Sequence, residues 1–185
     1  MKKTALFLIS CFFILFFAGC SSGGTDWAPL NLALPDPETD AAIPAEQVAV
    51  ALSTKSPLGG LEMTFSITGE NPSGVVSIYK AEKDYPTTLS GKPVREEKFS
   101  DLTEKIMWQF RTLPAGDYLI VFSELNAATL TRSIVPSAEA NGKILNYRNG
   151  EISTDGTCAL TLLFIKTNDS PEPELETFAY PVPEE

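Results

Sequence analysis

Apolar and polar residues alternate in short runs through the central part of the chain, and the clearest case lies between residues 105 and 124. Ile106, Trp108 and Phe110 occupy every second position, and after a short interruption the same period of two returns at residues 118–122. This period is typical of strands with one buried face. Because Pro114 and Gly116 lie between the two runs and favour a chain reversal, we expect a β-hairpin here.

The same alternation recurs along the rest of this region, with turn residues between the runs. A longer loop is expected at residues 81–93, and no segment has the 3.6-residue period of an amphipathic helix. Regularly spaced short strands with frequent turns predict an all-β fold, namely a two-sheet antiparallel β-sandwich of jelly-roll type. The expected strands, about nine in number, cover residues 48–52, 61–68, 75–79, 94–99, 105–111, 118–123, 129–135, 143–148 and 157–166.

Turn signals set the limits of these strands. Residues 57–60 and 69–74 are rich in glycine and proline and are expected to be turns. The pairs Asn141-Gly142 and Asn149-Gly150 enclose the strand at 143–148 and suit type I′ turns, whose central residues need positive φ.

Charge excludes one large class of function. The chain has a formal net charge of −10, yet every basic residue beyond Lys3 lies between Lys55 and Lys166, while acidic residues continue into both flanks. Nucleic acid is therefore not expected as a partner, because phosphate binding needs a basic face. The chain has no histidine, which excludes a Ser-His-Asp or Cys-His catalytic site and a histidine-ligated metal.

The first twenty residues resemble a bacterial lipoprotein signal peptide. Lys2 and Lys3 precede an apolar run, which ends at Ala18-Gly19-Cys20. In that family the two small residues precede a cysteine that becomes lipid-modified, and the resemblance therefore implies that Cys20 is the attachment site. The alternative is an uncleaved membrane span, but the apolar run at residues 4–19 would cover only about 24 Å as a helix, short of a ~30 Å hydrocarbon core.

This resemblance implies a protein of the bacterial cell envelope, held by its lipid on a membrane outside the cytoplasm. We divide the chain into a signal peptide at 1–19, a lipidated cysteine and tether at 20–47, a sandwich domain at 48–168 and an acidic, proline-rich tail at 169–185. The tether and the tail are expected to be mostly disordered. Trp27 and the leucines that follow it are the exception, since they have the composition of a short strand or a docking segment.

The domain itself resembles a known family of accessory jelly-roll domains. The matching residues are Ile78-Tyr79-Lys80, Asp84-Tyr85, Gly91-Lys92-Pro93-Val94 and Leu113-Pro114-Ala115-Gly116-Asp117-Tyr118. Such domains occur in secreted bacterial multidomain proteins and are similar to galactose-binding-like carbohydrate modules. The Leu-Pro-Ala-Gly-x-Tyr part also resembles prealbumin-like sandwiches, which keeps a structural or protein-interaction role open.

Sugar binding calls for an exposed aromatic ring beside polar groups. Tyr85, in the long loop, and Tyr147 are the candidate ligand-binding residues. The alternative for Tyr85 is packing as a loop anchor, and the alternative for Tyr147, which shares a face with Leu145, is a core or edge position. Trp108 is expected in the core, because it alternates in phase with Ile106 and Phe110. Cys158 is likewise expected in the core, since free cysteines are mostly buried.

No catalytic site emerges from the acidic residues. Glu96 and Glu97 are adjacent on an expected strand and therefore point to opposite faces, while Asp101 and Glu104 are expected in a solvated turn. We expect no enzyme activity, no cofactor and no metal. The first hypothesis is a membrane-tethered, non-catalytic module that binds a polysaccharide, and the second is a lipoprotein that binds an envelope protein through its strand edges and acidic tail.

Overall fold

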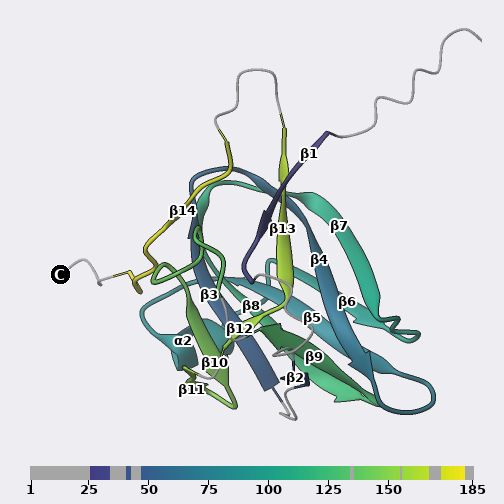
Figure 1. Ribbon diagram of the computed structural model, residues 1–185. Coiled ribbons are helices and arrows are strands. Elements are labelled where there is room, and N and C mark those ends of the chain that lie inside the picture. Colours follow the sequence, from purple (N-terminus) through teal and green to yellow (C-terminus); the bar gives the residue numbers. More distant parts are fainter. Residues whose placement is uncertain are drawn as a thin grey trace, which may run out of the picture.

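Two antiparallel sheets packed face to face form the protein (Figure 1). The computed structural model describes residues 26–33, 41–42, 47–133, 136–154, 156–166 and 172–181. The first sheet runs β1 (Trp27–Asn31), β13 (Leu160–Ile165), β4 (Leu58–Ile67), β9 (Ala128–Ser133) and β12 (Thr157–Cys158), with β2 (Ala41–Ala42) beside β9 and β7 (Lys105–Leu113) beside β4. The second runs β11 (Glu151–Ile152), β10 (Leu145–Arg148), β3 (Gln47–Thr54), β8 (Gly116–Asn126), β5 (Ser73–Lys80) and β6 (Arg95–Phe99), with β14 (Leu175–Glu176) beside β3.

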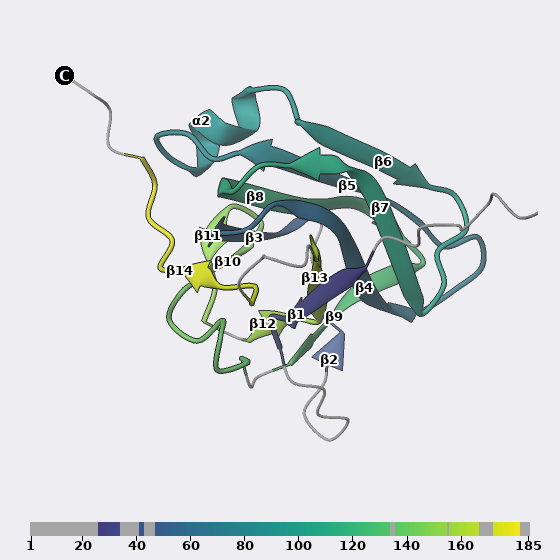
Figure 2. The ribbon, with the colours of Figure 1, turned by 90° about the horizontal axis from the view of Figure 1, so that it is seen from above.

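This architecture confirms the predicted all-β class and the two-sheet antiparallel sandwich. Each sheet has seven strands in the described part of the chain, and the fourteen together exceed the nine that were expected. The additional strands are short and come mainly from the flanks and from strands that are interrupted. Seen from above, the sheets form two layers that enclose the core (Figure 2).

The core between the sheets is built from the alternating apolar residues of both. Leu61, Met63 and Phe65 of β4 face Ile120 and Phe122 of β8, and all five side chains are buried. Trp108 and Cys158 belong to the same cluster, as the alternation indicated. Burial raises the pKa of the Cys158 thiol to about 12, because a low-polarity environment disfavours the thiolate.

The prediction of a hairpin at residues 105–124 is wrong, because the two predicted arms lie in different sheets. β7 pairs with β4, whereas β8 pairs with β3 and β5. The connection between them crosses from one sheet to the other, and the Tyr118 hydroxyl donates a hydrogen bond of 2.7 Å to the carbonyl oxygen of Pro114 across this corner. β7 buries only its inner face, whereas β8 is buried on both faces, with Ile120 and Phe122 in the core between the sheets and Leu119 and Val121 on the outer side of the second sheet.

Both flanks contribute to the sandwich, although the sequence analysis placed them outside it. β1, from the expected tether, pairs along its full length with β13. β14, from the expected tail, pairs with Ser53 and Thr54 of β3. Leu30 and Leu175 place their side chains in the core between the sheets. A segment that buries such side chains is folded despite its acidic and proline-rich composition.

A second apolar cluster covers the outer face of the second sheet. Its base is formed by small and apolar residues of β3 and β8, and its cover by α2 (Tyr85–Ser90) and by the chain segment after β14. The helix, which was expected as loop, lies against the outer side of this sheet (Figure 2). It begins at Asp84, whose carboxylate accepts a hydrogen bond of 2.8 Å from the Thr87 amide. This N-cap and the proline in the first turn stabilise a short helix without any amphipathic period.

Gly59 and Gly60 lie within β4 and not in a turn as expected. Asn149 and Gly150, by contrast, have positive φ values of 48° and 87° and connect β10 to β11 as predicted. In the described residues no helix is long and apolar enough to cross a membrane.

Candidate functional site

A cavity of about 560 Å³ runs along β1 at the edge of the first sheet. This size falls within the range of small-molecule sites, which is roughly 300–1,000 Å³. β1 forms one wall, and the segments after β9, after β13 and before β14 form the others. The lining residues are Trp27, Ala28, Pro29, Leu30, Asn31, Ser137, Glu139, Lys166, Glu172 and Pro173.

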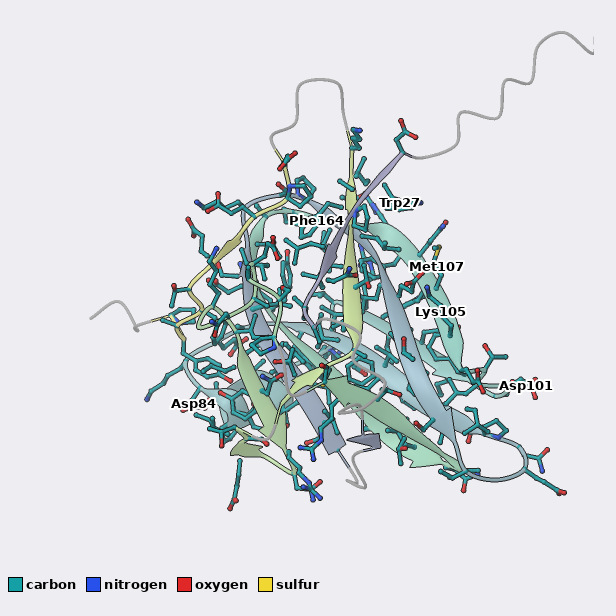
Figure 3. All side chains as sticks on the ribbon, in the orientation of Figure 1. Trp27, Asp84, Asp101, Lys105, Met107 and Phe164 are labelled. Atoms are coloured by element: carbon teal, nitrogen blue, oxygen red, sulfur yellow. The ribbon has the colours of Figure 1, made fainter. Side chains whose placement is uncertain are left out.

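Trp27, labelled in Figure 3, is the aromatic residue among those that line the cavity. It pairs with Ile165 of β13, and its side chain is partly buried. The indole lies over Gly59 of β4, so closely that a Cβ atom at this glycine would be 2.7 Å from Cζ3 of Trp27. Gly59 therefore leaves the space in which the indole rests on the outer face of the sheet.

Polar side chains also line the cavity. Asn31 is held in place by a hydrogen bond of 2.6 Å that the Thr161 hydroxyl donates to its Oδ1 atom. Lys166, Glu139 and Glu172 are exposed and line the cavity as well. With two carboxylates and one ammonium group, the lining repels a polyanion and suits a neutral ligand rich in hydroxyl groups.

The free edge of β1 is unsuited to the addition of another strand. The Lys166 amide donates to the Asp26 carbonyl and the Leu32 amide to the Leu160 carbonyl, at 2.8 and 2.9 Å. The even-numbered residues of this strand therefore direct their backbone groups toward β13, and the odd-numbered ones direct theirs outward. The central outward residue is Pro29, which has no N–H group, and a proline in this position blocks pairing with a further strand.

Tyr85 and Tyr147 are brought together, but in the second apolar cluster and not in a cavity. Their rings stack at a centroid distance of 4.4 Å, and both side chains are buried. The Tyr85 hydroxyl donates a hydrogen bond of 2.8 Å to Oε1 of Gln47. Burial raises the pKa of Tyr85 to about 12. Since neither ring has a free face, the arrangement matches the loop-anchor alternative, and sugar stacking on these rings would require the cover to move.

Tyr180 and Phe178 form part of that cover. Phe178 is buried in the cluster, and Tyr180 packs against it at a ring centroid distance of 5.0 Å. Burial also raises the pKa of the Tyr180 hydroxyl, and the neighbouring Tyr147 adds to the shift. The segment that was expected to be a solvated tail thus covers the two tyrosines that were expected to bind ligand.

The acidic residues considered for catalysis do not converge. Glu96 and Glu97 lie on β6, where Glu96 accepts a hydrogen bond of 3.1 Å from the Ser77 hydroxyl. Asp101 and Glu104 are exposed beyond the end of that strand. Within the described ranges, no three His, Cys, Asp or Glu side chains are grouped closely enough to hold a metal ion. Cys20, the predicted lipid-attachment residue, lies outside the described residues.

The cavity along β1 was not predicted, because its walls come from segments that were assigned to three different parts of the chain, namely the tether, the sandwich domain and the tail. The one signal for it was Trp27, an aromatic residue followed by alternating leucines within the expected tether. Comparison with known proteins finds no matching family model, no matching curated protein and no matching solved structure.

Proposed function

We propose that this protein is a non-catalytic binding module of the bacterial cell envelope, anchored by a lipid on Cys20, and that it binds a neutral glycan in the cavity along β1. The observation that carries the glycan part is that a partly exposed tryptophan, Trp27, lines the cavity together with the polar residues Asn31, Glu139 and Lys166. A sugar ring has apolar C–H faces that pack on an aromatic ring, and hydroxyl groups that need hydrogen-bond partners. The lipid part is supported by the Ala18-Gly19-Cys20 sequence after an apolar leader.

The alternative is a lipoprotein that binds another envelope protein through its strand edges and its tail. Pro29 argues against strand addition at β1, and the buried side chains of Leu175 and Phe178 remove part of the tail from solvent. The glycan proposal is therefore the better supported of the two.

Cys20→Ser is expected to abolish lipidation. The serine hydroxyl does not replace the thiol that receives the diacylglyceryl group, and the precursor should keep its signal peptide. Radiolabelled palmitate should therefore enter the wild type and not the variant. Wild-type protein that stays unlabelled and appears free in the medium would contradict the envelope location.

Trp27→Ala is expected to weaken glycan binding about tenfold, because aromatic packing contributes roughly 1–1.5 kcal/mol. Affinity electrophoresis of the purified domain through gels that contain neutral polysaccharides would measure this. Met107→Ala is a matched control, since Met107 is an exposed apolar residue of β7 in the same sheet and does not line the cavity.

Trp27→Tyr should restore part of the binding, which separates loss of the aromatic face from loss of β1. Equal retardation of Trp27→Ala and the wild type would refute the β1 cavity as the site. Absence of retardation on every polysaccharide would refute glycan binding itself and favour a protein partner.

A further inference from the structure

The point at which the folded sandwich begins limits the distance to the proposed lipid anchor. β1 begins at Trp27, and the Asp26 carbonyl already accepts a hydrogen bond of 2.8 Å from the Lys166 amide. Asp26 is only the sixth residue after Cys20. A chain of this length spans at most about 20 Å when fully extended, and about 13 Å on average if flexible. This segment, residues 20–26, is called the leash below. It is much shorter than the tether of residues 20–47 that the sequence suggested.

Several chain segments meet at the end of the sandwich where this leash attaches, which we call the anchor pole. Ile165 donates a backbone hydrogen bond to Pro57 in the β3–β4 turn, and Lys55 donates one to Glu174 ahead of β14. The start of β1 and the end of β13 lie side by side there, at the top of Figure 1. β4 is ten residues long, so its other end lies about 30 Å away along the strand.

We infer that the anchor pole faces the lipid headgroups and that the connection between β4 and β5 points away from the membrane. This inference rests on the proposed lipidation of Cys20. Because the leash is shorter than the length of the sandwich, the opposite end reaches the bilayer only if the domain lies on its side.

The charges at the anchor pole indicate that the lipid, and not electrostatic attraction, holds this surface at the membrane. Lys55 forms ion pairs of 3.1 and 3.7 Å with Glu174 and Glu176, and its charge is therefore already compensated. Lys166 donates a backbone hydrogen bond to Asp26 and lines the cavity together with Glu172, so that acidic residues lie near this lysine as well. An anionic membrane would not attract this mixture, and the orientation should therefore change little with ionic strength.

The orientation also limits which glycans can reach the cavity. The cavity extends along β1 from the anchor pole, where Trp27, Lys166 and Glu172 line it. In the proposed orientation this part of the cavity lies close to the bilayer. The glycan of the proposed function must be one that reaches the membrane surface.

Single-cysteine probes in vesicles test this orientation. Lys166→Cys places a fluorophore at the anchor pole and Glu70→Cys places one beyond the far end of β4, and both positions are exposed. Cys158 gives no background, because it is buried and its pKa is raised to about 12, and the sulfur of Cys20 is occupied by lipid in the mature protein. The lipidated protein is reconstituted in phosphatidylcholine vesicles that carry a quencher on the headgroup.

Quenching should be several-fold stronger at position 166 than at position 70. A flexible twelve-residue spacer inserted after Gly24 should bring the two values together, because it lengthens the leash without changing the sandwich. Protein that floats with the vesicles but shows equal quenching at both positions, or stronger quenching at position 70, would refute the orientation alone. Protein that does not float with the vesicles would refute the lipid anchor, and the orientation with it.

Discussion

Removal of residues 172–185 is expected to lower the free energy of unfolding by roughly 3–6 kcal/mol, a large part of the 5–15 kcal/mol that stabilises an ordinary domain. The segment inserts Leu175 into the core between the sheets and Phe178 into the outer cluster, where they are 1% and 6% exposed. Each buried side chain of this size contributes about 1.5–3 kcal/mol. The backbone pairing of β14 with β3 and a hydrogen bond of 2.8 Å from the Phe178 amide to the Lys143 carbonyl would be lost as well.

Urea denaturation of the purified domain would measure this loss. Removal of residues 182–185 alone is the control, since it leaves all of these contacts in place. Leu175→Ala should account for about 2–5 kcal/mol, because it leaves a cavity in the core, whereas Glu176→Ala next to it should have little effect, because Glu176 is exposed. A truncated protein as stable as the wild type would show that the segment is not part of the fold.

The composition of this tail explains why its docking was not predicted. Prolines and acids outnumber its apolar residues, which is typical of disordered segments. Leu175, Phe178 and Tyr180 were the signal, but three apolar residues without a regular period do not indicate which surface they cover. That surface is formed by Ala49 and Ala51 of β3 and by Leu119 and Val121 of β8, on the outside of the sheet.

The alternation of apolar residues was sufficient to predict the fold class and most of the core strands. It identifies which side chains are buried, but not which strand lies beside which, because a period of two is the same for any partner. This is why β7 and β8 were predicted as a hairpin although they belong to opposite sheets. For α2, the usable signal was local: an aspartate followed by a proline marks a helix start, and it required no amphipathic period.

The candidate site could not be predicted for the same reason, because the sequence does not indicate which segments lie side by side. Trp27 was recognised as unusual for a tether, yet its role follows only from its pairing with β13 and from the space above Gly59. Tyr85 and Tyr147 were selected because they were aromatic and expected near loops. Their burial is set by the packing of α2 and the chain after β14, which come from distant parts of the sequence.

The second prediction of large effect concerns Gly59 and Gly60, two adjacent glycines in β4. A side chain at Gly60 would meet backbone, whereas one at Gly59 would meet the end of another side chain. A Cβ atom at Gly60 would meet the backbone oxygen of Trp108 at 2.8 Å and Cδ1 of Leu163 at 3.2 Å. The oxygen belongs to β7, which pairs with β4 at this point. The strand cannot move away without loss of that pairing, and Gly60→Ala should cost about 2–4 kcal/mol, even though a Gly→Ala change also restricts the unfolded chain by about 0.4–1 kcal/mol in favour of folding.

Gly59→Ala should separate binding from stability. The atom it meets at 2.7 Å is Cζ3 of Trp27, at the far end of a side chain on the outer face of an edge strand. The indole can rotate away, and the loss of stability should therefore stay smaller than for Gly60→Ala, while the aromatic wall of the cavity is displaced. In parallel urea titrations and affinity gels, we expect Gly60→Ala to shift mainly the denaturation midpoint and Gly59→Ala mainly the retardation by polysaccharide. If Gly59→Ala binds as the wild type does, the position of the indole over this glycine is not what forms the site. If Gly60→Ala is as stable as the wild type, β4 and β7 do not approach each other as closely as this structure requires.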